Sequence, residues 1–126
     1  MGYRSQVVLA ISKHLTPFLT LAASQNAAAQ ALVFKDADTF DRDYGGDKSW
    51  LIAWDGIKWY ESYEDIQTLE KFVQEATSDE YKFEVDGEIQ ASSEHIKFVR
   101  VGEESDDIEM SGDGFWEIYP STSINY

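Results

Sequence analysis

The densest cluster of titratable side chains in the sequence lies in its C-terminal third, at residues 103–109. This stretch holds no base and five carboxylates: Glu103, Glu104, Asp106, Asp107 and Glu109. Like charges at this density repel one another, which favours an exposed connection between strands. Carboxylates spaced along such a segment can also imitate nucleic-acid phosphates and bind a row of Lys and Arg side chains. We therefore predict either a solvated loop or a partner-binding edge.

Three aromatic residues could add anchors to such an interface. Trp59, Tyr60 and Tyr63 follow one another closely, and Trp and Tyr are enriched among the residues that dominate binding energy. Large aromatic side chains also dominate protein cores, so burial is the alternative for each of them. We include all three among the predicted partner-binding residues.

The two histidines do not form a recognisable metal or catalytic motif. His14 and His95 occur outside any H-x-x-x-H or H-E-x-x-H pattern, which argues against a zinc site. The sequence contains no nucleophile elbow G-x-S-x-G and no glycine-rich phosphate loop. A Ser/His/Asp constellation assembled by folding stays open. With no cysteine, thiolate chemistry is excluded. We predict no catalytic residue, no metal and no cofactor.

An aspartate-rich stretch at residues 36–47 invites comparison with a calcium loop. Such a loop needs Gly at its sixth position and a bidentate Glu at its twelfth. Counted from Asp36, the sixth residue is Asp41; counted from Asp41, the twelfth is Ile52. The motif fails in both registers. We predict that residues 36–49 are a polar linker loop, with weak cation binding as an alternative.

The overall charge indicates which partners the chain can bind. The 126 residues carry 24 acids and 10 bases, a net charge of −14. All the acids follow residue 35, and 7 bases accompany them there. This charge repels nucleic acid and anionic membranes and attracts basic protein surfaces. No apolar run is long enough to span a membrane as a helix.

The elements that position these residues are clearest in the middle of the chain. Asp55-Gly56 between two apolar runs predicts a two-residue hairpin that joins strands at 50–54 and 57–60. Ser62 is a predicted helix N-cap. The helix after it has an apolar stripe at three- and four-residue spacing: Ile66, Leu69, Phe72, Val73 and Ala76.

The N-terminal third predicts a strand and a helix. Residues 3–12 are apolar on both faces of a strand, which predicts a central strand covered on both sides. Thr16-Pro17 predicts a helix start, and the Ala- and Leu-rich sequence that follows favours one helix.

The C-terminal third predicts several short strands. Strands are expected at 81–85 and 95–102, with a turn at Asp86-Gly87 after the first. A short strand around Ile108 and Met110 and a last strand at 115–119 follow. Residues 121–126 are predicted to be a frayed tail.

Three sequence elements resemble a known group of proteins. MGYRSQV at the start, IKWYESYEDI in the middle and FVRVGEESDDIE in the C-terminal third are together similar to small uncharacterised proteins of bacteriophages and prophages. Those open with M-G-Y-R-S-x-V and carry K-W-Y and R-I/V-G-E elements. The Ala-rich residues 15–32 depart from that pattern. The resemblance implies a virus-encoded accessory protein in the host cytoplasm and implies no activity or site residues.

These observations together predict a single α+β domain over residues 1–126. Its mainly antiparallel sheet has five to seven strands with two helices on one face, in the order β-α-β-β-α-β-β-(β)-β. The predicted function is binding: inhibition of a host defence complex, such as a CRISPR effector, or of a nucleic-acid-handling complex through a phosphate-mimicking surface. The partner is a basic host protein or nucleoprotein complex, without direct contact to nucleic acid or membrane. The alternatives are a structural protein that forms a homodimer and an enzyme with an unrecognised site.

Overall fold

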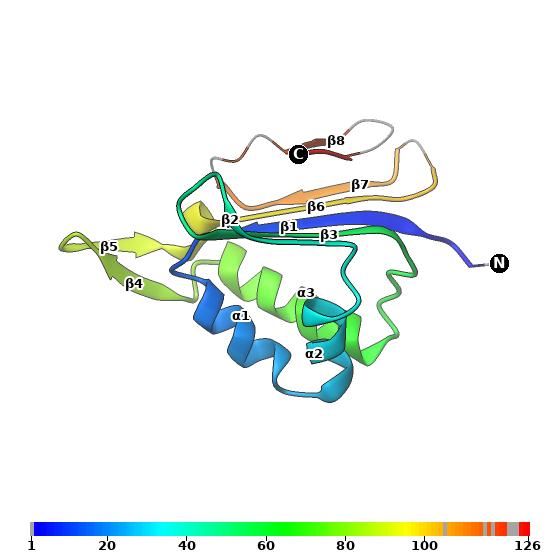
Figure 1. Ribbon diagram of the computed structural model, residues 1–126, viewed down its shortest axis with the longest axis horizontal. Coiled ribbons are helices and arrows are strands. Elements are labelled where there is room, and N and C mark those ends of the chain that lie inside the picture. Colours follow the sequence, from blue (N-terminus) through cyan, green and yellow to red (C-terminus); the bar gives the residue numbers. More distant parts are fainter. Residues whose placement is uncertain (1, 105, 115, 117, 121–123) are drawn as a thin grey trace.

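A five-stranded antiparallel sheet forms the centre of the molecule. The computed structural model describes residues 2–104, 106–114, 116, 118–120 and 124–126. The strands lie in the order β2-β3-β1-β6-β7 (Figure 1). Their bounds are β1 Ser5–Ile11, β2 Thr39–Tyr44, β3 Ser49–Ile57, β6 Ile96–Val101 and β7 Ile108–Ser111.

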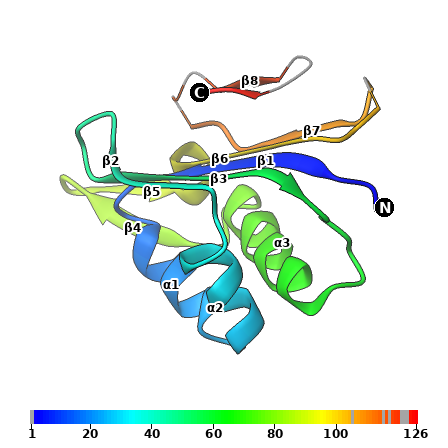
Figure 2. The ribbon, with the colours of Figure 1, turned by 45° about the vertical axis from the view of Figure 1, so that its right-hand side comes forward.

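Three helices cover one face of this sheet, where two were predicted. They are α1 Thr16–Ala23, α2 Ala27–Phe34 and α3 Glu64–Thr77 (Figures 1 and 2). The predicted stripe of α3 is confirmed, because all five of its apolar residues are buried against the sheet. The single helix predicted after Thr16 is divided at Asn26. Its side chain accepts a hydrogen bond from the N–H of Ala29 at 2.7 Å, which starts a second helix with an N-cap.

The opposite face of the sheet is covered by the C-terminal segment. Strands β8 Tyr119–Pro120 and β9 Ile124–Asn125 form a small hairpin above it (Figure 1). Ile118 and Ile124 pack there on Val8, Ala10 and other apolar residues of the sheet. This differs from the frayed tail predicted for residues 121–126: residues 121–123 lie outside the described ones, but β9 is paired and Ile124 is buried. Of the predicted strand 115–119, residues 115 and 117 also lie outside the described ones.

The prediction for β1 is confirmed. Every side chain from Val7 to Ile11 is fully buried. Odd-numbered residues face the helices and even-numbered ones face the C-terminal hairpin. A strand that is apolar on both faces therefore occupies the middle of a three-layered structure.

The hairpin predicted at Asp55-Gly56 is wrong. Strand β3 includes both residues and continues to Ile57. They face β1 at a bulge, because Ser5 pairs with Ile57 whereas Val7 pairs with Trp54. A lone glycine inside a strand is the usual mark of a bulge, where one strand carries an extra residue.

The prediction that residues 36–49 form a linker loop is also wrong, because this segment contains a paired strand. It contains β2, which pairs with β3, and the turn between them is made by Gly45 and Gly46. Both have positive φ, +77° and +79°, a conformation that glycine adopts without steric cost. The hairpin in this part of the chain therefore lies ten residues before the predicted one.

A second hairpin, β4 Lys82–Val85 with β5 Glu88–Ala91, extends beyond one end of the sheet (Figure 1). Its turn at Asp86-Gly87 is confirmed, with φ of +52° and +85°. A 3-10 turn, η1 Ser92–His95, leads from it into β6. The fold class is α+β, as predicted. No helix among the described residues is long and apolar enough to cross a membrane.

Candidate functional site

The acidic stretch forms the connection between β6 and β7 and continues into β7. Arg100 lies beneath it and donates two hydrogen bonds to Asp107, at 2.6 and 3.2 Å, and one to Glu109 at 2.8 Å. The guanidinium lowers the pKa of Asp107, and the hydroxyl of Tyr3 contributes in the same direction. Two of the five predicted carboxylates are therefore fixed to a base of the same chain.

Residues Tyr3 and Arg4 of the N-terminal segment form hydrogen bonds to the same loop. The hydroxyl of Tyr3 donates to Asp107 at 2.7 Å and accepts from the N–H of Glu104 at 3.0 Å. The N–H of Arg4 donates to the carboxylate of Glu103 at 2.8 Å. A Cβ on Gly102 would collide with Tyr3 and Asp107. The described residues Glu103, Glu104 and Asp107 of this loop are therefore each bonded to the N-terminal segment or to Arg100.

The three sequence elements that carry the phage resemblance meet at this place. Arg4 donates to the carbonyl of Gly56, just before the K-W-Y element. A Cβ on Gly2 would lie 2.8 Å from Cε of Lys58 and would collide with the hydroxyl of Tyr60. We call the region formed by residues 2–4, Arg100 and the described part of 102–109 the acidic corner. Its assembly from distant segments was not predicted.

The three aromatic candidates have different positions. Trp59 is 7% exposed and packs between Trp54 and Phe98 in the core. Its indole N–H donates to Glu70 at 2.8 Å, and burial raises the pKa of that carboxyl. Tyr63 is 42% exposed and its ring lies 5.1 Å from that of partly buried Tyr60. We leave Trp59 out of the contact surface and keep the tyrosine pair.

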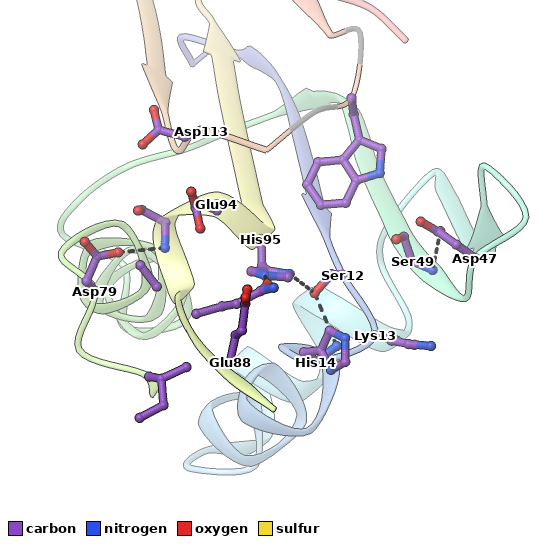
Figure 3. Close-up of a pocket in the computed structure, with 15 residues that line it drawn as sticks. Ser12, Lys13, His14, Asp47, Ser49, Asp79, Glu88, Glu94, His95 and Asp113 are labelled. Carbon is purple, nitrogen blue, oxygen red and sulfur yellow. Dashed lines mark hydrogen bonds between the residues drawn. The ribbon is translucent and has the colours of Figure 1, made fainter. Parts of the chain in front are cut away.

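A second polar region lies at the other end of β1 and β6. It is an open pocket of about 980 Å³. Its wall is formed by the end of β1, the turn before β3, strand β5 and η1 (Figure 3). We call it the histidine pocket, because both histidines of the sequence line it together with Ser12 and Gln90.

Four polar groups in the histidine pocket form a chain of hydrogen bonds. The backbone N–H of His14 donates to Oγ of Ser12 at 3.2 Å. Oγ of Ser12 lies 2.8 Å from Nδ1 of His95 (Figure 3), and Nε2 of His95 lies 2.5 Å from Oε1 of Gln90. An amide oxygen accepts only, so Nε2 carries a proton and the neutral ring accepts from Ser12 at Nδ1.

The surroundings of His95 favour this neutral form. Burial lowers its pKa, and the neighbouring His14 lowers it further, whereas Glu94 opposes the shift. The ring of Phe83, from β4, stacks on His14 at 5.3 Å and meets His95 edge-on at 4.8 Å. The pocket therefore presents a neutral imidazole with an accepting nitrogen towards a serine hydroxyl.

The aspartates of residues 36–47 serve the turns around β2. Asp38 accepts from the N–H of Asp55, Asp41 from that of Asp43, and Asp43 from that of Lys48. Short carboxylates that bond nearby backbone N–H groups are typical of turns. In the part of the chain that the structure describes, no group of three or more His, Asp or Glu side chains is arranged to hold a metal ion.

No protein-family model, curated protein or solved structure matches this chain. Function must therefore be argued from the geometry of these two regions. Sequence reasoning found the carboxylates of the first region. It did not predict the pairing of His95 with Ser12, because 83 residues separate them in the chain.

Proposed function

We propose that this protein acts by binding, as a phage-encoded accessory protein that covers a basic surface of a host protein in the cytoplasm. The observation that carries the proposal is the set of hydrogen bonds that ties the described residues of the acidic corner to Tyr3, Arg4 and Arg100. Glu103, Glu104 and Asp106 are exposed on a loop in which Tyr3 accepts from the backbone N–H of Glu104 and Arg100 binds the side chain of Asp107. A loop that is already ordered loses little conformational entropy when it binds, which increases affinity.

The charge of the molecule is largely unbalanced from within. Among the described residues, ion pairs join three carboxylates, those of Glu75, Asp107 and Glu109, to two bases, Lys71 and Arg100. Uncompensated carboxylates create a negative potential that attracts a basic partner over a distance set by the ionic strength. The surface of the corner would thus take the place of nucleic-acid phosphates on the partner.

The tyrosine pair would give this surface an apolar contact. Tyr60 lies against residue Gly2 of the acidic corner, and Tyr63 stands exposed beside it. Tyrosine is enriched among the residues that dominate binding energy at interfaces. The expected partner is therefore a basic nucleic-acid-binding protein with an apolar patch next to its Lys and Arg row.

Affinity capture from host lysate tests this function. The bait proteins are the wild type, the variant E103Q/E104Q/D106N and a matched control, D36N/E80Q/E84Q, which removes three exposed carboxylates elsewhere. We expect basic nucleic-acid-binding proteins on the wild type and the control, and roughly tenfold less on the corner variant. Double-stranded DNA and salt should release them. Equal capture by the two triple variants, or no basic protein on the wild type, would contradict the proposal.

Homo-oligomerisation is the second candidate, and the edge strand β7 favours it. Ile108 and Met110 are 39% and 48% exposed there, and β7 is the last strand at this side of the five-stranded sheet. Such an edge can pair with a second copy. Light scattering on the purified protein would show a dimer, and a charge on the edge, M110K, would dissociate it. A monomer at high concentration would rule this candidate out.

A further inference from the structure

The histidine pocket carries an inference that goes beyond the proposed binding function. We propose that Ser12 is a nucleophile activated by His95, and that the pocket accepts acyl groups from esters whose acyl part is positively charged. The sequence left a serine and histidine constellation open, and the fold assembles one from Ser12, His95 and Gln90. The argument rests on their hydrogen bonds, on access through the pocket and on the charge of its walls.

The hydrogen-bond geometry matches that of an activated serine. A nucleophile and its base must lie within about 2.6–3.2 Å, and a third group must orient the base. Ser12 and His95 are 2.8 Å apart, and Gln90 holds the far nitrogen of the ring. The N–H of His14 occupies one lone pair of Oγ, which leaves the hydroxyl proton to point at Nδ1.

The base is in the form that catalysis needs. Burial and the neighbouring His14 lower the pKa of His95, so the ring is neutral at pH 7 and can accept a proton. Gln90 bears no charge, so it orients the ring without raising its basicity as a carboxylate would. Gln90 is thus a positioning residue.

The pocket gives a substrate access to the serine and selects its charge. Ser12 is partly exposed and lines a space of about 980 Å³, within the range of small-molecule sites. Among the described lining residues, one is a lysine or arginine, Lys13. Five of the described lining residues are acidic, and each comes from a different element or connection: Asp47, Asp79, Glu88, Glu94 and Asp113. Walls of one sign concentrate the opposite charge, so a cationic acyl group is favoured over an anionic one.

The reaction is a transfer of the acyl group. Oγ of Ser12 forms a bond to the carbonyl carbon while its proton moves to Nδ1 of His95. The bond from that carbon to the leaving oxygen then breaks, and the proton passes from Nδ1 to the departing alkoxide. An acyl ester of Ser12 and a free alcohol result, with no change in oxidation state. Water activated by the same imidazole would release the acyl group as an acid.

Titration with p-nitrophenyl 4-guanidinobenzoate, a cationic ester, tests the proposal. We expect one p-nitrophenol to be released per chain and one guanidinobenzoyl group to be attached to each chain. Peptide mass analysis should locate this group on Ser12. S12A should abolish the adduct, and H95Q should slow its formation by about 10²-fold or more. The control S62A, which removes an exposed hydroxyl elsewhere, should react like the wild type. The anionic ester p-nitrophenyl succinate should react more slowly than the cationic one.

Two further measurements keep the test decisive if S12A alters the fold. The acylation rate should fall as the pH falls through the pKa of His95. The neighbours that act on this ring electrostatically are His14 and Glu94, and the other ionisable groups that line the pocket are Lys13, Asp47, Asp79, Glu88 and Asp113. The variant Q90E places a carboxylate on Nε2, so the midpoint of that pH profile should move upward by about one unit. An unmoved midpoint in Q90E would overturn the proposal.

The remaining outcomes are equally clear. No adduct on folded wild-type protein, or an equal adduct on folded S12A, would overturn the proposal and assign the hydrogen-bond chain to holding the β4–β5 hairpin. The corner variant E103Q/E104Q/D106N should still be acylated, and S12A should still capture partners. Failure of one function therefore leaves the other measurable.

Discussion

The two ends of the β1–β6 strand pair carry polar side chains of contrasting kinds. At the acidic corner, charged groups are tied to one another and to the N-terminal segment, and the loop they hold projects its remaining carboxylates outward. In the histidine pocket, the hydrogen-bonded side chains of Ser12, Gln90 and His95 are neutral and face a hollow. The comparison teaches that ion pairs and hydrogen bonds order charged groups at the acidic corner, whereas a partly buried, neutral imidazole lies beside a serine hydroxyl in the histidine pocket.

The largest expected effect comes from a glycine beside the histidine pocket. Gly112 has a φ of +92°, and an added Cβ would collide with the carbonyl of Ile96. The variant G112A should lower the free energy of unfolding by about 3 kcal/mol, from backbone strain and overpacking together. Urea denaturation measures this.

Gly46 provides the control for that substitution. Its φ is +79°, but nothing lies within 4 Å of an added Cβ. G46A should therefore cost about 1 kcal/mol, from the backbone alone. If the two variants lost equal free energy of unfolding, the close packing at Gly112 would not contribute to the stability of the fold.

A smaller effect is expected at the acidic corner. R100M should lower the free energy of unfolding by about 1 kcal/mol, because Asp107 and Glu109 lose a charged partner but stay 32% and 51% exposed. Capture of a basic partner should fall as well, since the loop loses its support. Unchanged stability with unchanged capture would show that the contacts of Tyr3 and Arg4 are sufficient to hold the loop.

The pH dependence of stability should separate the two ends. The pKa of His95 is lowered in the folded state, so its stabilising contribution is complete above the unfolded value of about 6.5 and is lost as the pH falls through the folded pKa. The pKa of Asp107 is lowered too, so its contribution is lost only below about pH 4. Thermal unfolding between pH 8 and 3 should show two separate losses.

Variants assign each of these losses to its end of the molecule. H95Q should remove the loss that begins below pH 6.5, and R100M should reduce the one below pH 4. If H95Q retained the full loss below pH 6.5, titration of His95 would not be its cause.

The smallest effect on stability is expected for Y63A. Tyr63 is exposed, so its removal should change the free energy of unfolding by less than about 0.5 kcal/mol. Partner capture should nevertheless fall, because the aromatic contact beside the acidic corner is lost. Unchanged capture would limit the contact surface to the carboxylates.

Much of the fold could be read from local patterns. The stripe of α3, the turn at Asp86-Gly87 and the double-sided burial of β1 follow from periodicity and from the conformations that glycine permits. The turn before β3 was not predicted because Asp55-Gly56 and Gly45-Gly46 both favour turns. The local sequence does not show which of the two pairs is incorporated into a strand by pairing with a neighbour. The pairing of β3 with β1 turned Asp55-Gly56 into a bulge.

The sequence by itself determined the composition of both regions: a run of carboxylates after Gly102, two isolated histidines and a net charge of −14. Tertiary structure decided which groups meet. Antiparallel pairing of β1 with β6 sets Ile11 opposite Ile96, which brings Ser12 beside His95. The same pairing sets Gln6 opposite Val101, which brings Tyr3 and Arg4 to the acidic loop. Strand register depends on contacts across the whole sheet, so no local pattern contains it.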